Sequence, residues 1–162
     1  MDKVIRSLTL TMVLLSLMFV FHLQQRLIIP VVVKTNNSTI VKLQSVGINS
    51  QEIAKSVEMV SNQTKLSKEF LIALMTTESN GNKYAVSCKG YKGLMQIPHS
   101  VYYTDANILI GARIFLEKMQ ITNQDLEKAI CLYKGYPINS IRGLQQARKV
   151  ISIYNKLSKM EV

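Results

Sequence analysis

The chain has 162 residues, which is enough for one domain with an additional segment and excludes two domains of ordinary size. Its residues are 48% hydrophobic and 19% charged, a composition that fits a globular domain with an extra apolar segment. Twenty Lys and Arg against ten Asp and Glu give a net charge of +10, and the chain without residues 1–26 is still at +8 (17 against nine). The folded part is therefore expected to meet an anionic partner, such as nucleic acid, acidic lipid headgroups or the carboxylates of a cell-wall polymer.

The N-terminal segment has the pattern of a membrane helix. Residues 7–25 include no Asp, Glu, Lys or Arg, and in a helix they span about 28 Å, close to the ~30 Å hydrocarbon core of a bilayer. Lys3 and Arg6 precede this run, as in signal peptides and signal anchors, and no small-x-small cleavage site follows it. We expect residues 1–26 to be an uncleaved single-pass anchor with its N-terminus in the cytoplasm. A cleaved signal peptide is the alternative.

Residues 27–47 are expected to form a linker or short extended piece, because Asn36–Thr39 interrupts the strand-forming Pro30–Val33. From residue 48 to 159 the chain has only helix and loop patterns, which predicts a compact all-α domain. Gly111 inside one expected helix indicates a close packing contact. The expected helices are a first capped by Asn49 with Glu52, a second over 68–79 capped by Ser67, a third over 107–119, a fourth capped by Thr122 with Asp125 and ended by Gly135 and Pro137, and a fifth over 140–158.

Glu78 is the most informative carboxylate. Leu74 and Leu71 precede it by four and seven residues, so Glu78 belongs to the apolar face of its helix. Loss of hydration there and the negative end of the helix dipole both favour the neutral carboxyl, the form that a general acid needs. A glutamate that extends to solvent at a helix end is the alternative interpretation.

Other patterns point away from cofactors and metals. The two cysteines, Cys88 and Cys131, form no CxxC or Cys/His ligand spacing, so we expect no metal site; if the domain is exported they are a candidate disulfide. No nucleotide-binding motif occurs, and no cofactor is expected. Residues 90–93 match the bare GxxG of a KH loop without its flanking strands, so nucleic acid is not an expected partner.

Several motifs together resemble one known family, the soluble-type lytic transglycosylases (the transglycosylase SLT domain). The resemblance covers about residues 48–157 and implies the mostly helical fold of the lysozyme-like α+β superfamily, with an active-site cleft. Its motifs are Glu78-Ser79-x-x-Asn82-x-x-Ala85-Val86-Ser87, Gly90, Gly93-Leu94-Met95-Gln96-Ile97, Asn107-Ile108-x-x-Gly111, Ala129-x-x-x-Tyr133 and Tyr154.

The resemblance implies that Glu78 is the single catalytic acid and base in cleavage between N-acetylmuramic acid and N-acetylglucosamine of peptidoglycan, leaving 1,6-anhydro ends. Ser79 and Tyr133 are expected to orient Glu78, and Met95 and Gln96 to line the sugar subsites. The full set of residues expected at the substrate is Ser79, Gly93, Leu94, Met95, Gln96, Asn107 and Tyr133. Apart from Glu78, residues 70–103 contain no Asp or Glu, in agreement with a one-carboxylate mechanism.

The chain departs from the family at three places. Lys134 follows Tyr133 where the family has asparagine, and Pro98-His99-Ser100 replaces the usual Pro-x-Thr. Only eight residues separate Pro98 from Asn107, which predicts a trimmed groove wall. The resemblance implies a domain on the periplasmic side of the inner membrane, or on a virion membrane, that serves an envelope-spanning machine or a phage. A lysozyme-type hydrolase that uses water and a non-catalytic wall-binding module remain alternatives.

Overall fold

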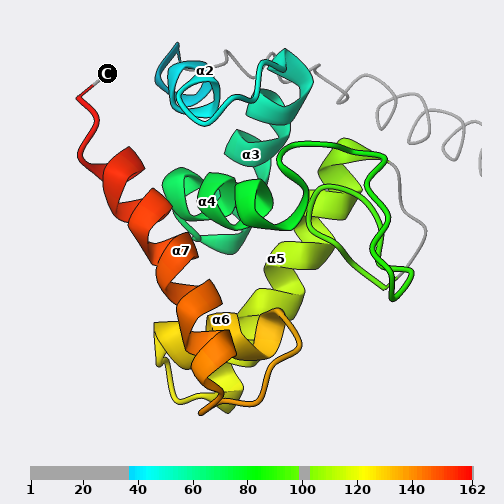
Figure 1. The fold of residues 1–162 in the computed structure, drawn as a ribbon. Coiled ribbons are helices and arrows are strands. Elements are labelled where there is room, and N and C mark those ends of the chain that lie inside the picture. The colour runs from blue at the N-terminus through cyan, green and yellow to red at the C-terminus, as the bar shows by residue number, and fades with distance from the viewer. Residues whose placement is uncertain (1–36, 99–102, 162) are drawn as a thin grey trace, which may run out of the picture. The chain divides into compact units, whose positions relative to one another are not determined.

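The structure is a computed structural model that describes residues 37–98 and 103–161. The chain divides into two units, residues 1–32 and 33–162, and all described residues belong to the second. The regular elements among the described residues are all helices, joined by loops: α2 (Asn37–Gln44), α3 (Gln51–Thr64), α4 (Lys68–Ser79), α5 (Thr104–Ile121), α6 (Leu126–Tyr133) and α7 (Ile141–Ser158) (Figure 1). The mostly helical class is thus confirmed.

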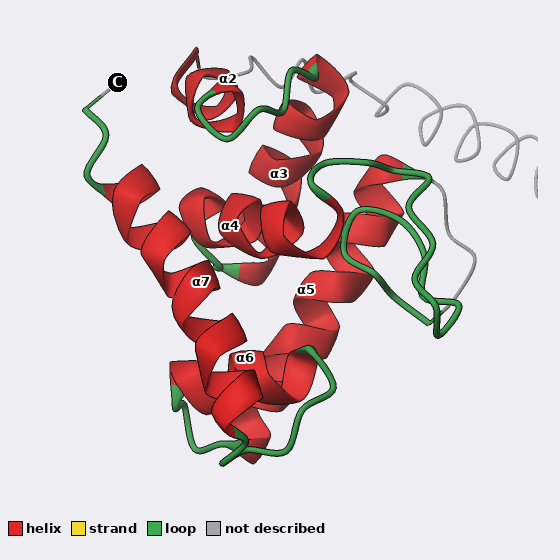
Figure 2. Ribbon diagram, in the orientation of Figure 1, coloured by secondary structure: helices red, strands yellow, loops and turns green. Residues whose placement is uncertain are grey.

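Within the described part, strand-like pairing is limited to two isolated antiparallel bridges, Val86 with Lys92 and Lys92 with Ile97, in the loop after α4 (Figure 2). The anchor expected at residues 1–26 lies outside the described residues. Of the helices that the structure does describe, none has the length and apolar character needed to cross a membrane.

Short polar side chains set the starts of four helices by accepting a backbone hydrogen bond from the first turn. Ser67 caps α4, as expected, and Ser140, predicted as the first residue of the last helix, is the cap of α7. Two helices have N-cap residues that differ from the predicted ones. Ser50, not Asn49, accepts from the backbone of α3, and Asp125 alone caps α6, since the Thr122 hydroxyl bonds to the backbone around it.

Helix α4 lies at the centre of the domain, packed against α7 on one side and α3 and α2 on the other (Figure 1). Six consecutive residues, 70–75, are buried, so this helix is apolar around most of its circumference rather than along one stripe. Phe70 stacks against Phe115 of α5 with ring centroids 4.5 Å apart, and Tyr154 of α7 meets the Phe70 ring edge-on. The first turn of α4 is therefore held by both α5 and α7.

Residues 37–44, within the range expected to be a linker, are helical instead. Helix α2 packs on α3 and α4 with its Leu43 side chain fully buried in the core, and two polar contacts add to this packing. Thr39 donates a hydrogen bond of 2.8 Å to Glu58, and Lys42 pairs with Glu69 at 2.6 Å. Thr39, one of the residues interpreted as strand breakers, is thus a partner of the buried Glu58 carboxylate, which local patterning does not reveal.

Candidate active site

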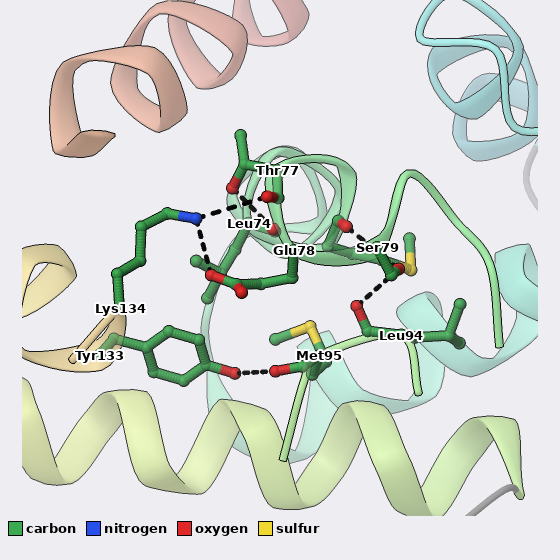
Figure 3. A network of polar contacts seen from close by, with 9 residues as sticks. Leu74, Thr77, Glu78, Ser79, Leu94, Met95, Tyr133 and Lys134 are labelled. Carbon is green, nitrogen blue, oxygen red and sulfur yellow. Dashed lines mark hydrogen bonds and ion pairs between the residues drawn. The ribbon is translucent and has the colours of Figure 1, made fainter. Parts of the chain in front are cut away.

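Glu78 occupies the last turn of α4, two residues before the C-cap residue Asn80, whose φ of +53° ends the helix. Its carboxylate oxygen Oε1 lies 2.7 Å from the Nζ atom of Lys134, the residue that follows α6 (Figure 3). Only 13% of the Glu78 side chain and 7% of the Lys134 side chain are exposed. Lys134 also donates to the carbonyl oxygen of Thr77, at 3.4 Å. Glu78 is thus a partly buried carboxylate with a cationic partner, not a glutamate extended to solvent.

Tyr133, the residue before Lys134, is held in place through its hydroxyl and its ring. Its hydroxyl donates a 2.7 Å hydrogen bond to the carbonyl oxygen of Met95 (Figure 3). Its ring packs edge-on against Phe115. Burial of the hydroxyl, with the nearby charge of Glu78 adding to it, raises the pKa of Tyr133 well above its usual value. Tyr133 is therefore a neutral donor near the carboxylate, and its hydrogen bond holds the Met95 segment.

Gly111 of α5 allows Met95 and the Tyr133 hydroxyl to lie close to that helix. A Cβ atom at Gly111 would lie 2.4 Å from the Met95 Cβ and 3.0 Å from the Tyr133 hydroxyl oxygen. The predicted packing contact of Gly111 is confirmed, and its partners are the loop after α4 and the end of α6.

Ser79 connects α4 to the same loop. Its hydroxyl donates to the carbonyl oxygen of Leu94 at 2.8 Å, and it lies 3.4 Å from the carbonyl oxygen of Met75. These hydrogen bonds orient the loop rather than the Glu78 carboxylate. The side chains of Leu94 and Met95 are fully buried, so the expectation that Met95 lines a sugar subsite is wrong for its side chain. Both residues contribute backbone carbonyls instead.

Gly93 and Asn107 form the other support of this loop. The Asn107 side chain accepts from the Met95 N–H at 2.9 Å and donates to the Lys92 carbonyl at 3.2 Å. Gly93 has a φ of +78°, and a Cβ there would lie 2.2 Å from Asn107 Nδ2. The close approach that glycine permits is therefore to Asn107 within the protein, and the buried Asn107 is a structural clamp.

Gln96 borders a cavity that Tyr133 also lines. Its amide nitrogen donates to the carbonyls of Ala85 and Gly93, so the side chain is held in place although its backbone φ is +47°. The cavity measures about 210 Å³. Its lining residues are Tyr91, Gln96, Pro98, Ile114, Lys118, Leu132, Tyr133 and Gly135. Aromatic, amide and cationic groups thus meet there, and Tyr133 contributes both to this cavity and to the surroundings of Glu78.

The candidate disulfide is not formed. Cys88 lies in the exposed loop after α4, whereas Cys131 is buried on the inner side of α6, and both are free thiols. Burial is the main cause that raises the pKa of Cys131, so this thiol is packed in the core and uncharged. No group of three or more His, Cys, Asp or Glu side chains gathers within the described residues.

Lys134 is the residue of the site that sequence reasoning missed. It was noted only as a departure from the family, at the position after Tyr133. Lys134 and Glu78 are 56 positions apart in the chain, so local patterns do not reveal their pairing. The only sign in the sequence is that a lysine stands where the family has asparagine.

Comparison with known proteins gives one result for this region. No curated protein matches the chain significantly. Residues 55–105, which include Glu78, Ser79 and the 93–96 loop, match the family model of the transglycosylase SLT domain. That match supports a transglycosylase or lysozyme-like function directed at peptidoglycan. The resemblance of this chain to the soluble-type lytic transglycosylases is thereby confirmed.

Proposed function

We propose that the chain is a lytic transglycosylase that cleaves the bond between N-acetylmuramic acid and N-acetylglucosamine of peptidoglycan, with Glu78 as its general acid and base. The observation that carries this function is the position of Glu78. It lies partly buried at the end of α4, within the matched segment 55–105, and is the only acidic residue between positions 70 and 103.

One carboxylate is sufficient when the nucleophile belongs to the substrate. The neutral Glu78 carboxyl gives its proton to the glycosidic oxygen as the bond from that oxygen to C1 of the muramoyl ring breaks. The resulting carboxylate then takes the proton of the C6 hydroxyl while that oxygen attacks C1. This closes a 1,6-anhydro ring, and Glu78 regains its proton for the next cycle.

Two cavities, one lined by Tyr133 and one by Thr77, have side chains that suit a wall polymer. The 210 Å³ cavity offers Tyr91 for contact with a sugar face and Lys118 for an anionic group. A second, more open cavity of about 520 Å³ includes Thr77, beside Glu78, together with Arg148 and Lys149 of α7. Cationic side chains at both cavities are complementary to the carboxylates of the peptide stems.

The test is digestion of purified sacculi with mass analysis of the released muropeptides. We expect anhydro ends, lighter by one water than reducing ends, from the wild type and from Glu117→Gln, which alters an exposed carboxylate of α5. We expect none from Glu78→Gln. Reducing ends alone would instead identify a lysozyme-type hydrolase. Binding to sacculi with no release by any variant would identify a non-catalytic wall-binding module.

We also propose that residues 1–26 anchor the domain outside the cytoplasmic membrane, where it opens the wall locally for an envelope-spanning machine or a phage. The uncharged run of residues 7–25 supports this location. Alkaline carbonate extraction of membranes that hold the full chain tests it. Retention in the pellet, with loss of retention in a chain that begins at Leu27, is expected. Release of the full chain would contradict the anchor.

A further inference from the structure

Lys118, in the last turn of α5, is the only charged residue among the described residues that line the cavity of about 210 Å³. The other lining residues are aromatic, aliphatic, amide-bearing or glycine. Lys118 is half-buried, so its side chain is partly removed from water. A cation in such surroundings is stabilised by an anionic group close to it.

No carboxylate of the described residues forms an ion pair with Lys118. The positions three and four residues away on α5 are isoleucine, phenylalanine and threonine, and none of them is acidic. Lys42 and Lys134, whose side chains are almost entirely covered, are different, because they pair with Glu69 and Glu78. The described part of the domain thus supplies no counterion to Lys118, and an anionic group of a ligand in the cavity can take that role.

The cavity and the candidate catalytic carboxylate are linked by consecutive residues. Tyr133 lines the cavity and is the residue before Lys134, which pairs with Glu78 (Figure 3). Pockets that hold drug-sized ligands measure about 300 to 1,000 Å³, so this smaller cavity suits one small group of a polymer. A glycan bound for cleavage at Glu78 would then present such a group to Lys118.

We propose that Lys118 is a specificity-determining residue that binds a carboxylate of the glycan substrate and thereby favours carboxylate-bearing wall polymer over an uncharged form of the same strand. This inference rests on the proposed function and extends it by assigning recognition of one chemical group to one side chain. Peptidoglycan has two sources of that group. One is the lactyl carboxylate of a muramoyl residue, which is free once its peptide stem has been removed. The other is a carboxylate of the stem itself.

Lys118→Met tests the proposal because it removes the charge and keeps an unbranched side chain. Three uncrosslinked substrates are compared: strands with stems, strands freed of stems by an amidase, and stem-free strands whose lactyl carboxylates have been converted to neutral methylamides. A hydrogen bond to a charged group is worth a factor of about ten or more. On at least one carboxylate-bearing substrate, kcat/KM of Lys118→Met should therefore fall about tenfold or more relative to the wild type, and much less on the methylamides.

The substrate on which the loss occurs identifies the source of the carboxylate. The loss should lie in KM, with kcat nearly unchanged, because a contact away from the reacting bond stabilises the bound substrate and the transition state alike. Lys118→Arg keeps the charge and should retain most of the selectivity. Losses of equal size on all three substrates, or no loss on either carboxylate-bearing substrate, would overturn the proposal.

Lys55→Met is the matched control, since it deletes the same charge from an exposed position on α3, and its selectivity should equal that of the wild type. Far-UV circular dichroism establishes that the compared variants are folded. Lys118→Gln repeats the test with a polar side chain, so that the result does not depend on the folding of one variant.

A second readout does not depend on catalysis. In the Glu78→Gln background, calorimetric titration with the same strands measures affinity directly, and adding Lys118→Met should weaken binding of the recognised substrate about tenfold or more. Unchanged affinity would overturn the role of Lys118. Absence of cleavage by the wild type, together with binding that depends on Lys118, would contradict the enzymatic function alone.

Discussion

Replacing Gly111 with alanine tests how tightly the candidate site is assembled. Gly111 is in the middle of α5, where alanine would ordinarily stabilise the helix by about 0.5 to 1 kcal/mol. The added methyl group, however, would lie 2.4 Å from the Met95 Cβ and 2.8 Å from its Cγ. A Cβ atom is attached to the backbone and is unable to rotate away, so the loop or the helix has to move.

Overpacking of this kind typically costs about 1 to 3 kcal/mol. Movement of Met95 also strains the 2.7 Å hydrogen bond from Tyr133, which contributes about 1 kcal/mol. After subtraction of the helix-propensity gain, we expect Gly111→Ala to lower the free energy of unfolding by about 1 to 3 kcal/mol. Because the displaced segment supports the site, cleavage of sacculi should fall as well.

Urea denaturation followed by circular dichroism measures this change. Arg113 is an exposed position on the same helix, and the pair Arg113→Ala and Arg113→Gly measures helix propensity alone. Alanine should be the more stable residue at 113, by about 1 kcal/mol, and the less stable residue at 111. If Gly111→Ala is as stable as the wild type or more so, the close contact with Met95 is refuted.

Three further predictions concern contacts of the same domain. Tyr133→Phe should lower the free energy of unfolding by about 1 to 2 kcal/mol in urea titrations, because the Met95 carbonyl loses its donor. Burial alone raises the pKa of Glu69, but hydrogen bonds and the charge of Lys42 outweigh it and lower that pKa on balance. Its stabilising contribution is therefore complete above the pKa of an unfolded glutamate and is lost as pH falls through the folded value, which unfolding titrations between pH 7 and pH 3 measure. A thiol reagent should modify one cysteine, Cys88, in the native protein and a second only after unfolding.

Each of these has a matched control. Tyr103 is 80% exposed, so Tyr103→Phe should leave the free energy of unfolding nearly unchanged, and an equal loss in both variants would contradict the role of the Tyr133 hydroxyl. Lys42→Met should reduce the acid-dependent loss of stability, and an unaltered pH dependence would refute the pairing with Glu69. Cys88→Ser should abolish the rapid thiol reaction, and a remaining rapid phase would show that Cys131 is accessible.

Local patterns predicted most of the helices well. The spacing of apolar residues located α7 within a residue, and with the cap Ser67 it located α4, because these signals depend only on neighbours in sequence. Helix α2 was missed for the opposite reason. Its eight residues have little apolar patterning, and it is held by Lys42 and Thr39 through contacts with carboxylates of α4 and α3. Such partners are not visible from the segment itself.

The same distinction holds at the site. The sequence by itself determined that Glu78 ends an apolar helix, that a glycine-containing loop follows, and that both match one family of wall-directed enzymes. Those are properties of residues close together in the chain. Only the tertiary structure decided that Met95 faces the core and that Lys134 pairs with Glu78. Side-chain burial and charge pairing arise from contacts between residues far apart in the chain, here between the end of α4 and the residue that follows α6, and a local pattern does not contain such contacts.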